Sequence, residues 1–101
     1  MDITIDIQTG HIVAALIGDF DTAASAEAER SLAPIFEHDD CDVVIDCTEL
    51  NYISSSGLRL LINVYKHTHA NGKETILKGL SAEVAEVFNL SGFFQLFKIL
   101  K

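Results

Sequence analysis

Three consecutive serines and a glycine occupy positions Ser54–Gly57, directly before a helical pattern that begins near Leu58. The first turn of a helix leaves backbone N–H groups without intrahelical partners, and the helix dipole adds positive potential there. A serine at this place can cap the helix, and an anionic group at the same place is stabilised. Because one serine is enough to cap, two interpretations stay open: a cap followed by a closely packed glycine, or a site for an anionic group.

The remaining reactive side chains do not form a catalytic pattern. A nucleophilic serine needs an adjacent base, and no histidine has a spacing that places it beside Ser55. On a helix, His67 and His69 would point about 200° away from each other, unlike the one-sided pair of a helical metal site. The sequence has no Gly-rich loop ending in Lys-Ser/Thr, no G-x-G-x-x-G run and no cluster of ligand cysteines. We therefore expect no enzymatic activity, no bound metal and no cofactor.

Acidic side chains accompany the serine run. Asp19, Asp21 and Asp46 follow or end strands on the side where the loop to Ser55 also emerges, so we expect them to share a rim with that loop. Asp39, Asp40 and Asp42 are expected to be solvated surface. This loop side of the sheet is the predicted site.

Composition and charge narrow the class of protein. The 101 residues are 49% hydrophobic and 22% charged, as in an ordinary globular domain. A chain of this size can form one core without disulfide or metal support, so we expect a single domain over residues 1–101. The net charge of -8 repels phosphate backbones and anionic lipids, so no direct nucleic-acid partner is expected.

The sequence gives no sign of a membrane or secretory segment. No apolar run approaches the roughly 20 residues that cross a bilayer, and Met1–Thr4 lacks the basic start of a signal peptide. We expect a cytoplasmic location without membrane insertion. Cys41 and Cys47 flank an extended segment that holds their Cα atoms roughly 20 Å apart, beyond disulfide reach. Both are expected to be reduced packing residues.

Apolar periodicity predicts the elements of the first part of the chain. Ile3–Ile7 alternates with polar residues as a half-exposed strand does, and His11–Gly18 returns after a tight turn as a second strand. The next helix can be capped by Asp21 or Thr22, and Pro34 should end or bend it. Its expected buried face consists of Ala24, Ala28, Leu32, Ile35 and Phe36.

The middle of the chain predicts a central strand and a long helix. Val43–Ile45 is apolar on consecutive positions, so we expect both faces of this central strand to be covered. A helix should run from about Ser55 to His69 and stop at Asn71–Gly72. A short strand should follow at Thr75–Lys78.

The last part of the chain completes an α/β order. A helix should begin after a Ser81 cap and end at Gly92. Its expected buried residues are Val84, Val87, Phe88 and Leu90. The apolar segment Phe93–Leu100 is either a terminal element that seals the core or a tail that binds a partner. The order ββαβαβα predicts one α/β domain with flanking helices and a mixed sheet of four to five strands. We expect an antiparallel hairpin followed by parallel strands, which right-handed helical crossovers join.

The segment Val43–Leu61, with the sequence VVIDCTELNYISSSGLRLL, resembles the signature of the STAS domain, which is found in bacterial anti-sigma factor antagonists. Gly18–Asp21 resembles the second signature of that family, which has a Gly, an acidic residue, an apolar residue and Asp before the first helix. The element order fits the family from about residue 2 to residue 100, so the resemblance covers nearly the whole chain.

The resemblance implies a regulatory binding protein. In that family a small cytoplasmic protein binds the serine kinase that acts as anti-sigma factor and so releases a sigma factor. Phosphorylation of one serine at this helix start by the kinase switches it off, and a serine phosphatase reverses the switch. On this chain the phosphorylated residue would be Ser55, and the expected partner-binding residues are Asp21, Ser54, Ser56, Gly57 and Leu58. The alternative is a STAS scaffold, or a subunit of a transporter ATPase complex, whose serines only cap the helix.

Overall fold

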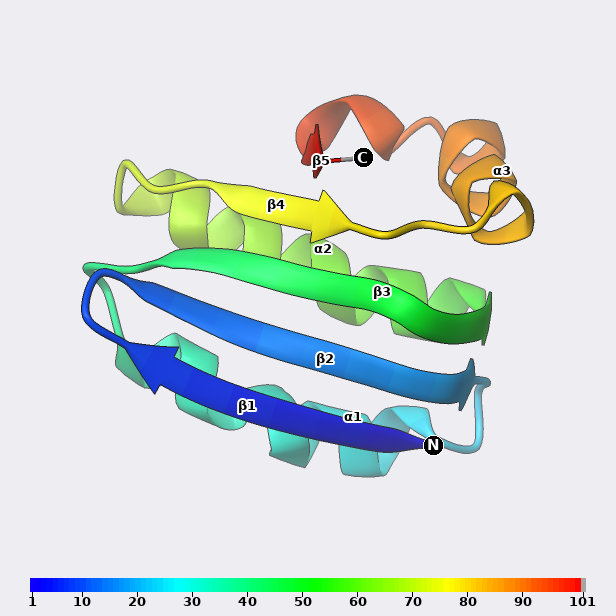
Figure 1. Ribbon diagram of the computed structural model, residues 1–101, viewed down its shortest axis with the longest axis horizontal. Helices are drawn as coiled ribbons and strands as arrows, with labels where there is room; N and C mark the ends of the chain where they lie inside the picture. The colour runs from blue at the N-terminus through cyan, green and yellow to red at the C-terminus, as the bar shows by residue number, and fades with distance from the viewer. Residues whose placement is uncertain (101) are drawn as a thin grey trace.

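The computed structural model describes residues 1–100, which form a five-stranded sheet and three α-helices (Figure 1). The strands are β1 (Asp2–Gln8), β2 (His11–Phe20), β3 (Asp42–Ile53), β4 (Thr75–Lys78) and β5 (Lys98–Leu100). The helices are α1 (Ser25–Leu32), α2 (Ser55–Ala70) and α3 (Ala82–Ser91), with the 3₁₀ helices η1 (Ala33–Glu37) and η2 (Phe94–Leu96). Lys101, the last residue of the expected domain, lies outside the described residues.

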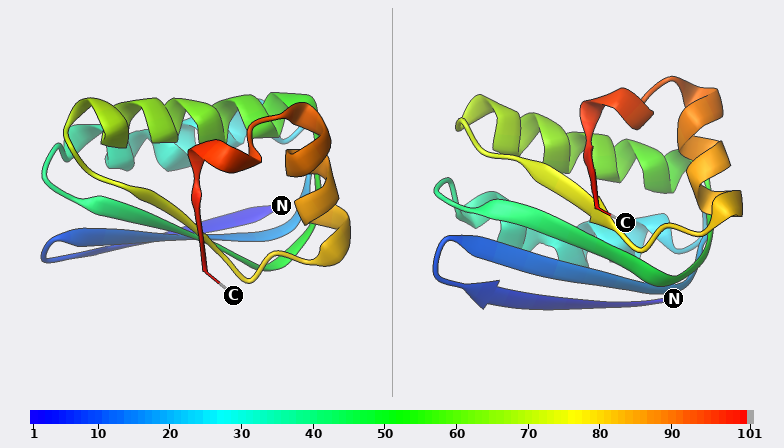
Figure 2. Two further views of the ribbon diagram at one scale, coloured as in Figure 1. Left: turned by 90° about the horizontal axis from the view of Figure 1, so that it is seen from above. Right: turned by 45° about the horizontal axis from the view of Figure 1, so that its top comes forward.

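The strands lie in the sheet in their chain order, from β1 to β5. Strand β1 pairs antiparallel with β2, and the other neighbours pair parallel. Because the chain moves across the sheet in one direction throughout, right-handed crossovers place their helices on one face. Figure 2 shows α1 and α2 on the same face of the sheet. The predicted mixed α/β sheet, with a hairpin followed by parallel strands, is confirmed.

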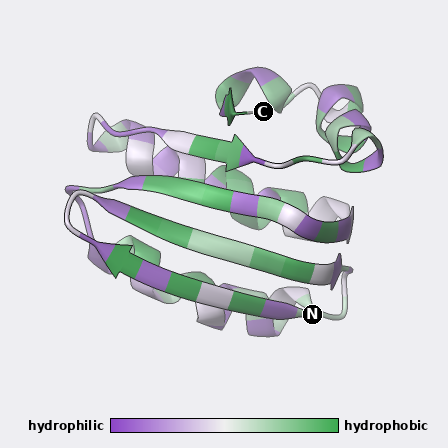
Figure 3. Ribbon diagram, in the orientation of Figure 1, coloured by the Kyte–Doolittle hydropathy of each residue, from purple (hydrophilic) through white to green (hydrophobic). Residues whose placement is uncertain are grey.

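One hydrophobic core lies between the sheet and this helical layer, and it includes side chains from all three helices. Apolar residues gather in β2, β3 and β4 (Figure 3). Strand β3 is central, as predicted. Within the apolar run Val43–Ile45, the side chains of Val43 and Ile45 are buried, whereas Val44 on the other face is half-buried. The expectation that both faces of β3 are covered was therefore wrong, because the helices α1 and α2 lie on one face.

The segment around α1 differs from the sequence prediction in two details. Asp21 caps a turn ahead of the helix, where its Oδ1 accepts the Ala24 N–H at 2.8 Å, and α1 itself begins at Ser25. Pro34 lies in the first turn of η1 and changes the α-helix to the tighter 3₁₀ form. With three residues per turn, Ile35 stays in the core whereas Phe36 turns outward and is 41% exposed.

The C-terminal part confirms both predicted ends of α3. The Ser81 Oγ accepts the Val84 N–H at 3.2 Å, and Gly92 terminates the helix with φ +80°. Leu90, which was expected inside, is 79% exposed because six residues after Val84 it has rotated to another side of the helix. Phe97 is buried and packs edge to face on Phe88, with ring centroids 5.7 Å apart, so this residue seals the core. Phe93, Leu96 and Leu100 of the same segment are exposed.

The start of α2 is fixed against the end of β2. The Ser54 N–H donates to the Phe20 carbonyl at 2.8 Å, and the Ser54 Oγ accepts the Gly57 N–H at 3.1 Å. A Cβ added to Gly57 would lie 2.7 Å from Cδ1 of Phe20 and 3.1 Å from Cγ1 of Ile53. Glycine is therefore required here for the helix to approach the strand ends this closely.

We predict that Gly57→Ala destabilises the protein by about 1 to 2 kcal/mol, because overpacking against the buried Phe20 ring outweighs the better helix propensity of alanine. Urea unfolding followed by circular dichroism measures this, with Ser56→Ala in the same turn as the matched control. Equal stability of the two variants would mean that Phe20 yields without cost.

We also predict that Ser54→Ala lowers the free energy of unfolding by about 1 kcal/mol, because the Gly57 N–H loses its cap. Ser55→Ala should change it by less than about 0.5 kcal/mol, because Ser55 is exposed and does not cap. The same unfolding experiment compares the two variants directly. A larger loss for Ser55→Ala than for Ser54→Ala would contradict the assignment of the cap.

Candidate functional site

The three serines at the start of α2 have three different environments. Ser54 is the N-cap and is buried, with 7% of its surface exposed. Ser55 is exposed and Ser56 is half-buried, and within residues 1–100 neither side chain makes a hydrogen bond. The fold therefore uses the hydroxyl of Ser54 and leaves the hydroxyl of Ser55 accessible to another molecule.

Asp21 lies next to this helix start through the pairing of β2 with β3. The two strands pair as far as Phe20 and Ile53, with register shifts between Ala15 and Ile17 and between Gly18 and Asp19. The Ser54 N–H then bonds to the Phe20 carbonyl. Asp21 and Ser55 are the next residues after this bonded pair, and both are exposed. The structure thus brings together residues 34 positions apart in the sequence, as the sequence predicts.

Gly57 and Leu58 lie on the core side of the α2 start and pack it against the sheet. Gly57 is buried against Phe20 and Ile53, and Leu58 points into the core with 5% of its surface exposed. Their positions hold the first turn of α2 on the sheet and offer almost no surface to a partner. The exposed and half-buried residues at this helix start are Asp21, Ser55 and Ser56, which we call the α2 rim.

The electrostatics of the α2 rim suit an added negative charge on Ser55. Helix α2 spans 16 residues, and its first turn contains no acidic side chain. Its unpaired N–H groups and dipole therefore favour an anion at this end. The nearest carboxylate in the rim, that of Asp21, already accepts a backbone N–H from Ala24. The first turn of α2 is thus a place where an anionic group is stabilised.

Two further acidic residues, Asp19 and Asp46, were expected at the rim, but only Asp19 lies near it. Asp19 pairs with Tyr52 near the ends of β2 and β3, close to the rim. Asp46 lies inside β3, where it pairs with Ala15 and Lys78. Its carboxylate accepts hydrogen bonds from the Thr48 hydroxyl and N–H, which hold the pKa of Asp46 below its usual value. Asp46 is therefore not a rim residue, because β3 continues seven residues beyond it to Ile53.

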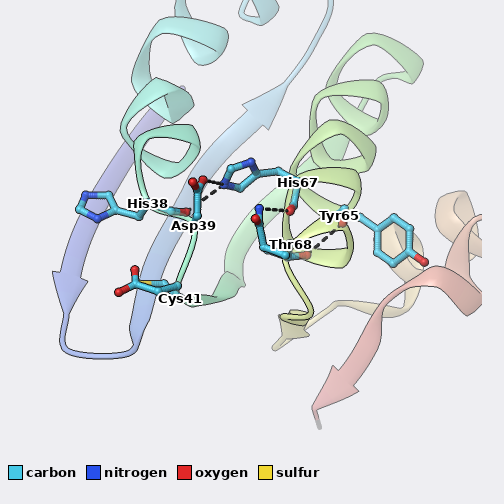
Figure 4. Close-up of polar contacts among 8 residues, drawn as sticks. His38, Asp39, Cys41, Tyr65, His67 and Thr68 are labelled. Atoms are coloured by element: carbon cyan, nitrogen blue, oxygen red, sulfur yellow. Dashed lines mark hydrogen bonds and ion pairs between the residues drawn. The ribbon is translucent and has the colours of Figure 1, made fainter.

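The histidines lie far from Ser55. His67 and His69 are in the last turn of α2, roughly 18 Å along the helix from its first residue. His67 Nε2 contacts the His38 carbonyl at 2.9 Å and the Asp39 carboxylate at 3.6 Å (Figure 4). His11 begins β2, at the end of the strand opposite Phe20. A serine–histidine catalytic pair at Ser55 is thereby excluded.

Both cysteines are free and buried, as predicted for packing residues. Burial, with a smaller contribution from the charge of Asp46, raises the pKa of the Cys47 thiol to about 12. Burial and the neighbouring Asp40 raise the pKa of the Cys41 thiol. Both shifts disfavour the thiolate form that a nucleophilic cysteine needs.

No helix within residues 1–100 has the length and apolar character needed to cross a membrane. The features that remain are a short helix-terminal rim, a buried serine cap and an exposed neighbouring serine. These are features of a binding surface, and comparisons with known proteins agree with that description.

The chain is similar in sequence and in fold to known proteins. It is 35% identical over 99 residues to BtrV of Bordetella bronchiseptica, covering 98% of this chain and 85% of BtrV. It is 26% identical over 102 residues to the anti-sigma-B factor antagonist of Listeria monocytogenes, covering 98% of this chain and 90% of that protein. The structure of the anti-sigma factor antagonist SpoIIAA in its unphosphorylated form matches with a TM-score of 0.76 at 17% identity, covering 99% and 88% of the two chains.

The family comparison agrees with the strand order and with the signature around the serine run. The family model described as the STAS domain matches residues 2–101, which is nearly the whole sequence. Together with the sheet that carries an N-terminal hairpin and the helix that starts at Ser55, this match shows that the chain belongs to the STAS domain family.

Proposed function

We propose that this chain is a cytoplasmic anti-sigma factor antagonist. It binds an anti-sigma factor serine kinase through the α2 rim, which releases a sigma factor, and phosphorylation of Ser55 ends the binding. A serine phosphatase restores the binding state. The chain itself catalyses no step. The proposal rests on one observation at the start of α2: the Ser54 side chain is buried as the helix cap, whereas the Ser55 side chain is exposed.

The comparisons support the class of function. The Listeria relative is named an anti-sigma-B factor antagonist. SpoIIAA, a structural neighbour, also has a structure in its phosphorylated form, which matches this chain with a TM-score of 0.74 at 19% identity. A phosphoryl group is therefore compatible with this fold in at least one other protein.

The proposed switch depends on the negative charge of a phosphoryl group on Ser55. The fold can accommodate this charge, whereas a bound partner cannot. A phosphoryl group adds a charge of about -1.5 to -2 and three acceptor oxygens. On Ser55 it lies at the positive end of α2, so the stability of the domain should hardly change. A partner that covers the rim must desolvate this charge or oppose it with its own, at a cost of several kcal/mol. Such a cost lowers affinity by more than about a hundredfold.

Ser54 separates this chain from many family members, which have Asp directly before the phosphorylated serine. Serine and aspartate are comparable N-caps, so the cap is kept. The difference is that Ser54 leaves no carboxylate beside Ser55. Recognition by the kinase must then depend on the remaining rim residues, including Asp21.

We predict that phosphopeptide mapping of the protein purified from its own host finds phosphate on Ser55. Ser54 is a poor acceptor because its hydroxyl is buried and engaged with Gly57. Protein carrying Ser55→Ala, expressed in the same host, is the control and should lack the modification. Phosphate on Ser54 or Ser56 in the unaltered protein would show that the modified serine has been misassigned.

For partner binding, we predict that Ser55→Ala binds the kinase as tightly as the unmodified chain, whereas Ser55→Asp binds more weakly. Chain carrying phosphoserine at residue 55 should bind more weakly still, because one carboxylate carries less charge and fewer acceptor oxygens than a phosphoryl group. Immobilised Ser55→Ala is used to capture partners from host lysate, and the affinity of each variant for the purified kinase is then measured.

Melting temperatures recorded on the same samples show whether altered binding reflects altered folding. Recovery of a transporter ATPase without any serine kinase would reject the proposal in favour of a transporter-associated role. Equal affinity of phosphorylated and unmodified chains would reject the switch.

A further inference from the structure

Three different metal-binding side chains gather in the connection between η1 and β3, away from the α2 rim. They are the imidazole of His38, the carboxylate of Asp40 and the thiol of Cys41. One donor atom from each lies within 4.8 Å of the other two. Figure 4 shows His38 and Cys41 on one side of this connection, with His67 on the other side.

The backbone of this connection is held in place on both sides. The His38 N–H donates to the Ile35 carbonyl at 3.2 Å, and the His38 carbonyl contacts the His67 ring at 2.9 Å. The Asp42 N–H donates to the Gly10 carbonyl at 3.1 Å. Three neighbouring elements thus fix the chain around the donor atoms, so a ligand entering here meets an ordered segment.

From this arrangement we infer that His38, Asp40 and Cys41 form a binding site for a divalent transition-metal ion of the Zn²⁺ class. Imidazole, thiolate and carboxylate are the ligands that Zn²⁺ uses in proteins, whereas Mg²⁺ and Ca²⁺ prefer oxygen alone. Water supplies the fourth tetrahedral ligand. The site is independent of the proposed function.

The geometry lies within reach of a tetrahedral site. Zn²⁺ bonds of about 2.0 to 2.3 Å place neighbouring ligand atoms roughly 3.3 to 3.8 Å apart. The donor atoms, at most 4.8 Å apart, must therefore close by about 1 Å. Asp40 is exposed and His38 half-buried, so both can rotate, whereas Cys41 is buried and fixes one corner.

The charges around the site favour a cation. The Cys41 Sγ donates to Asp40 Oδ1 at 3.6 Å, so the thiol proton lies where the metal would bind. Binding releases this proton, and the resulting thiolate and the Asp40 carboxylate balance the two positive charges of the ion. Asp39 and Asp42 are neighbours of these residues in the chain and add negative charge, whereas the positive charge of Lys73 acts on the Cys41 thiol in the opposite sense. Affinity should therefore fall as the pH is lowered, because protons compete for the thiolate.

The test is a titration of the reduced, metal-free full chain with Co²⁺, which reports a bound thiolate by a sulfur-to-cobalt charge-transfer absorption. We expect this band in the unaltered chain, its removal by excess Zn²⁺, and a higher melting temperature with Zn²⁺. Cys41→Ser should abolish the band. His38→Asn and Asp40→Asn should each weaken Co²⁺ binding by at least about tenfold.

Two control variants make the assignment specific. Cys47→Ala removes the other thiol, and Asp39→Asn removes a neighbouring carboxylate that contacts His67, so both should keep the band. Asp40 is exposed, so Asp40→Asn remains folded even if the variants at buried positions do not. Absence of a sulfur band in the unaltered chain would overturn the inference, as would unchanged Co²⁺ affinity in Asp40→Asn.

Discussion

The contact between the first turn of α2 and the last residue of β2 is the constraint on which the functional end of this protein depends. Gly57 has no side chain, and this lets α2 lie directly on the Phe20 ring. The hydrogen bond from the Ser54 N–H to the Phe20 carbonyl fixes the same place along the backbone. With Ser54 held inward as the cap, the next residue of the helix, Ser55, has to face outward. One close approach therefore decides which serine is structural and which is accessible.

The topology gives the two ends of the sheet different chemistry. Parallel strands β2 and β3 both end at the α2 rim, where a helix N-terminus provides positive potential. At the opposite end, β3 begins beside the connection that carries His38, Asp40 and Cys41, and α2 ends with His67 and His69. A charge added to Ser55 and a cation bound at His38 would therefore act on separate ends of the domain. The helical layer on one face of the sheet connects the two ends (Figure 2).

The sequence predicted those elements whose structure depends on neighbouring residues in the chain. Serine caps, left-handed glycines and alternating strands depend on a few neighbouring residues, so Ser81, Gly92 and the β1–β2 hairpin could be predicted correctly. The half-exposure of Val44 could not be predicted from the sequence, because a run of apolar residues does not indicate whether helices cover one face of the sheet or both. Phe36 was wrongly expected to be buried because Pro34 changes the helical period after α1. Leu90 was wrongly expected to be buried because its spacing from Val84 does not fit the buried face of α3.

The site was predictable to a similar degree. The serine run and Asp21 could be identified from their place next to strand ends, and the structure brings them together. The separate roles of Ser54 and Ser55 depend on the rotation of α2 about its axis, which is set by the Gly57–Phe20 contact and not by the serines themselves. Likewise, the convergence of His38, Asp40 and Cys41 depends on how a short connection turns between η1 and β3, for which no periodic pattern exists.

In the proposed switch, a phosphoryl group on Ser55 changes the surface of the α2 rim and leaves the fold intact. The most direct measurement is a pair of ¹⁵N–¹H NMR spectra, recorded for the chain with serine and with phosphoserine at residue 55. We expect shifts confined to residues around Asp21 and the first turn of α2, with the Gly57 amide still protected from exchange by its Ser54 cap. Shifts spread through β1 and β4, or rapid exchange of the Gly57 amide, would contradict it, because the phosphoryl group would then act by disrupting the fold.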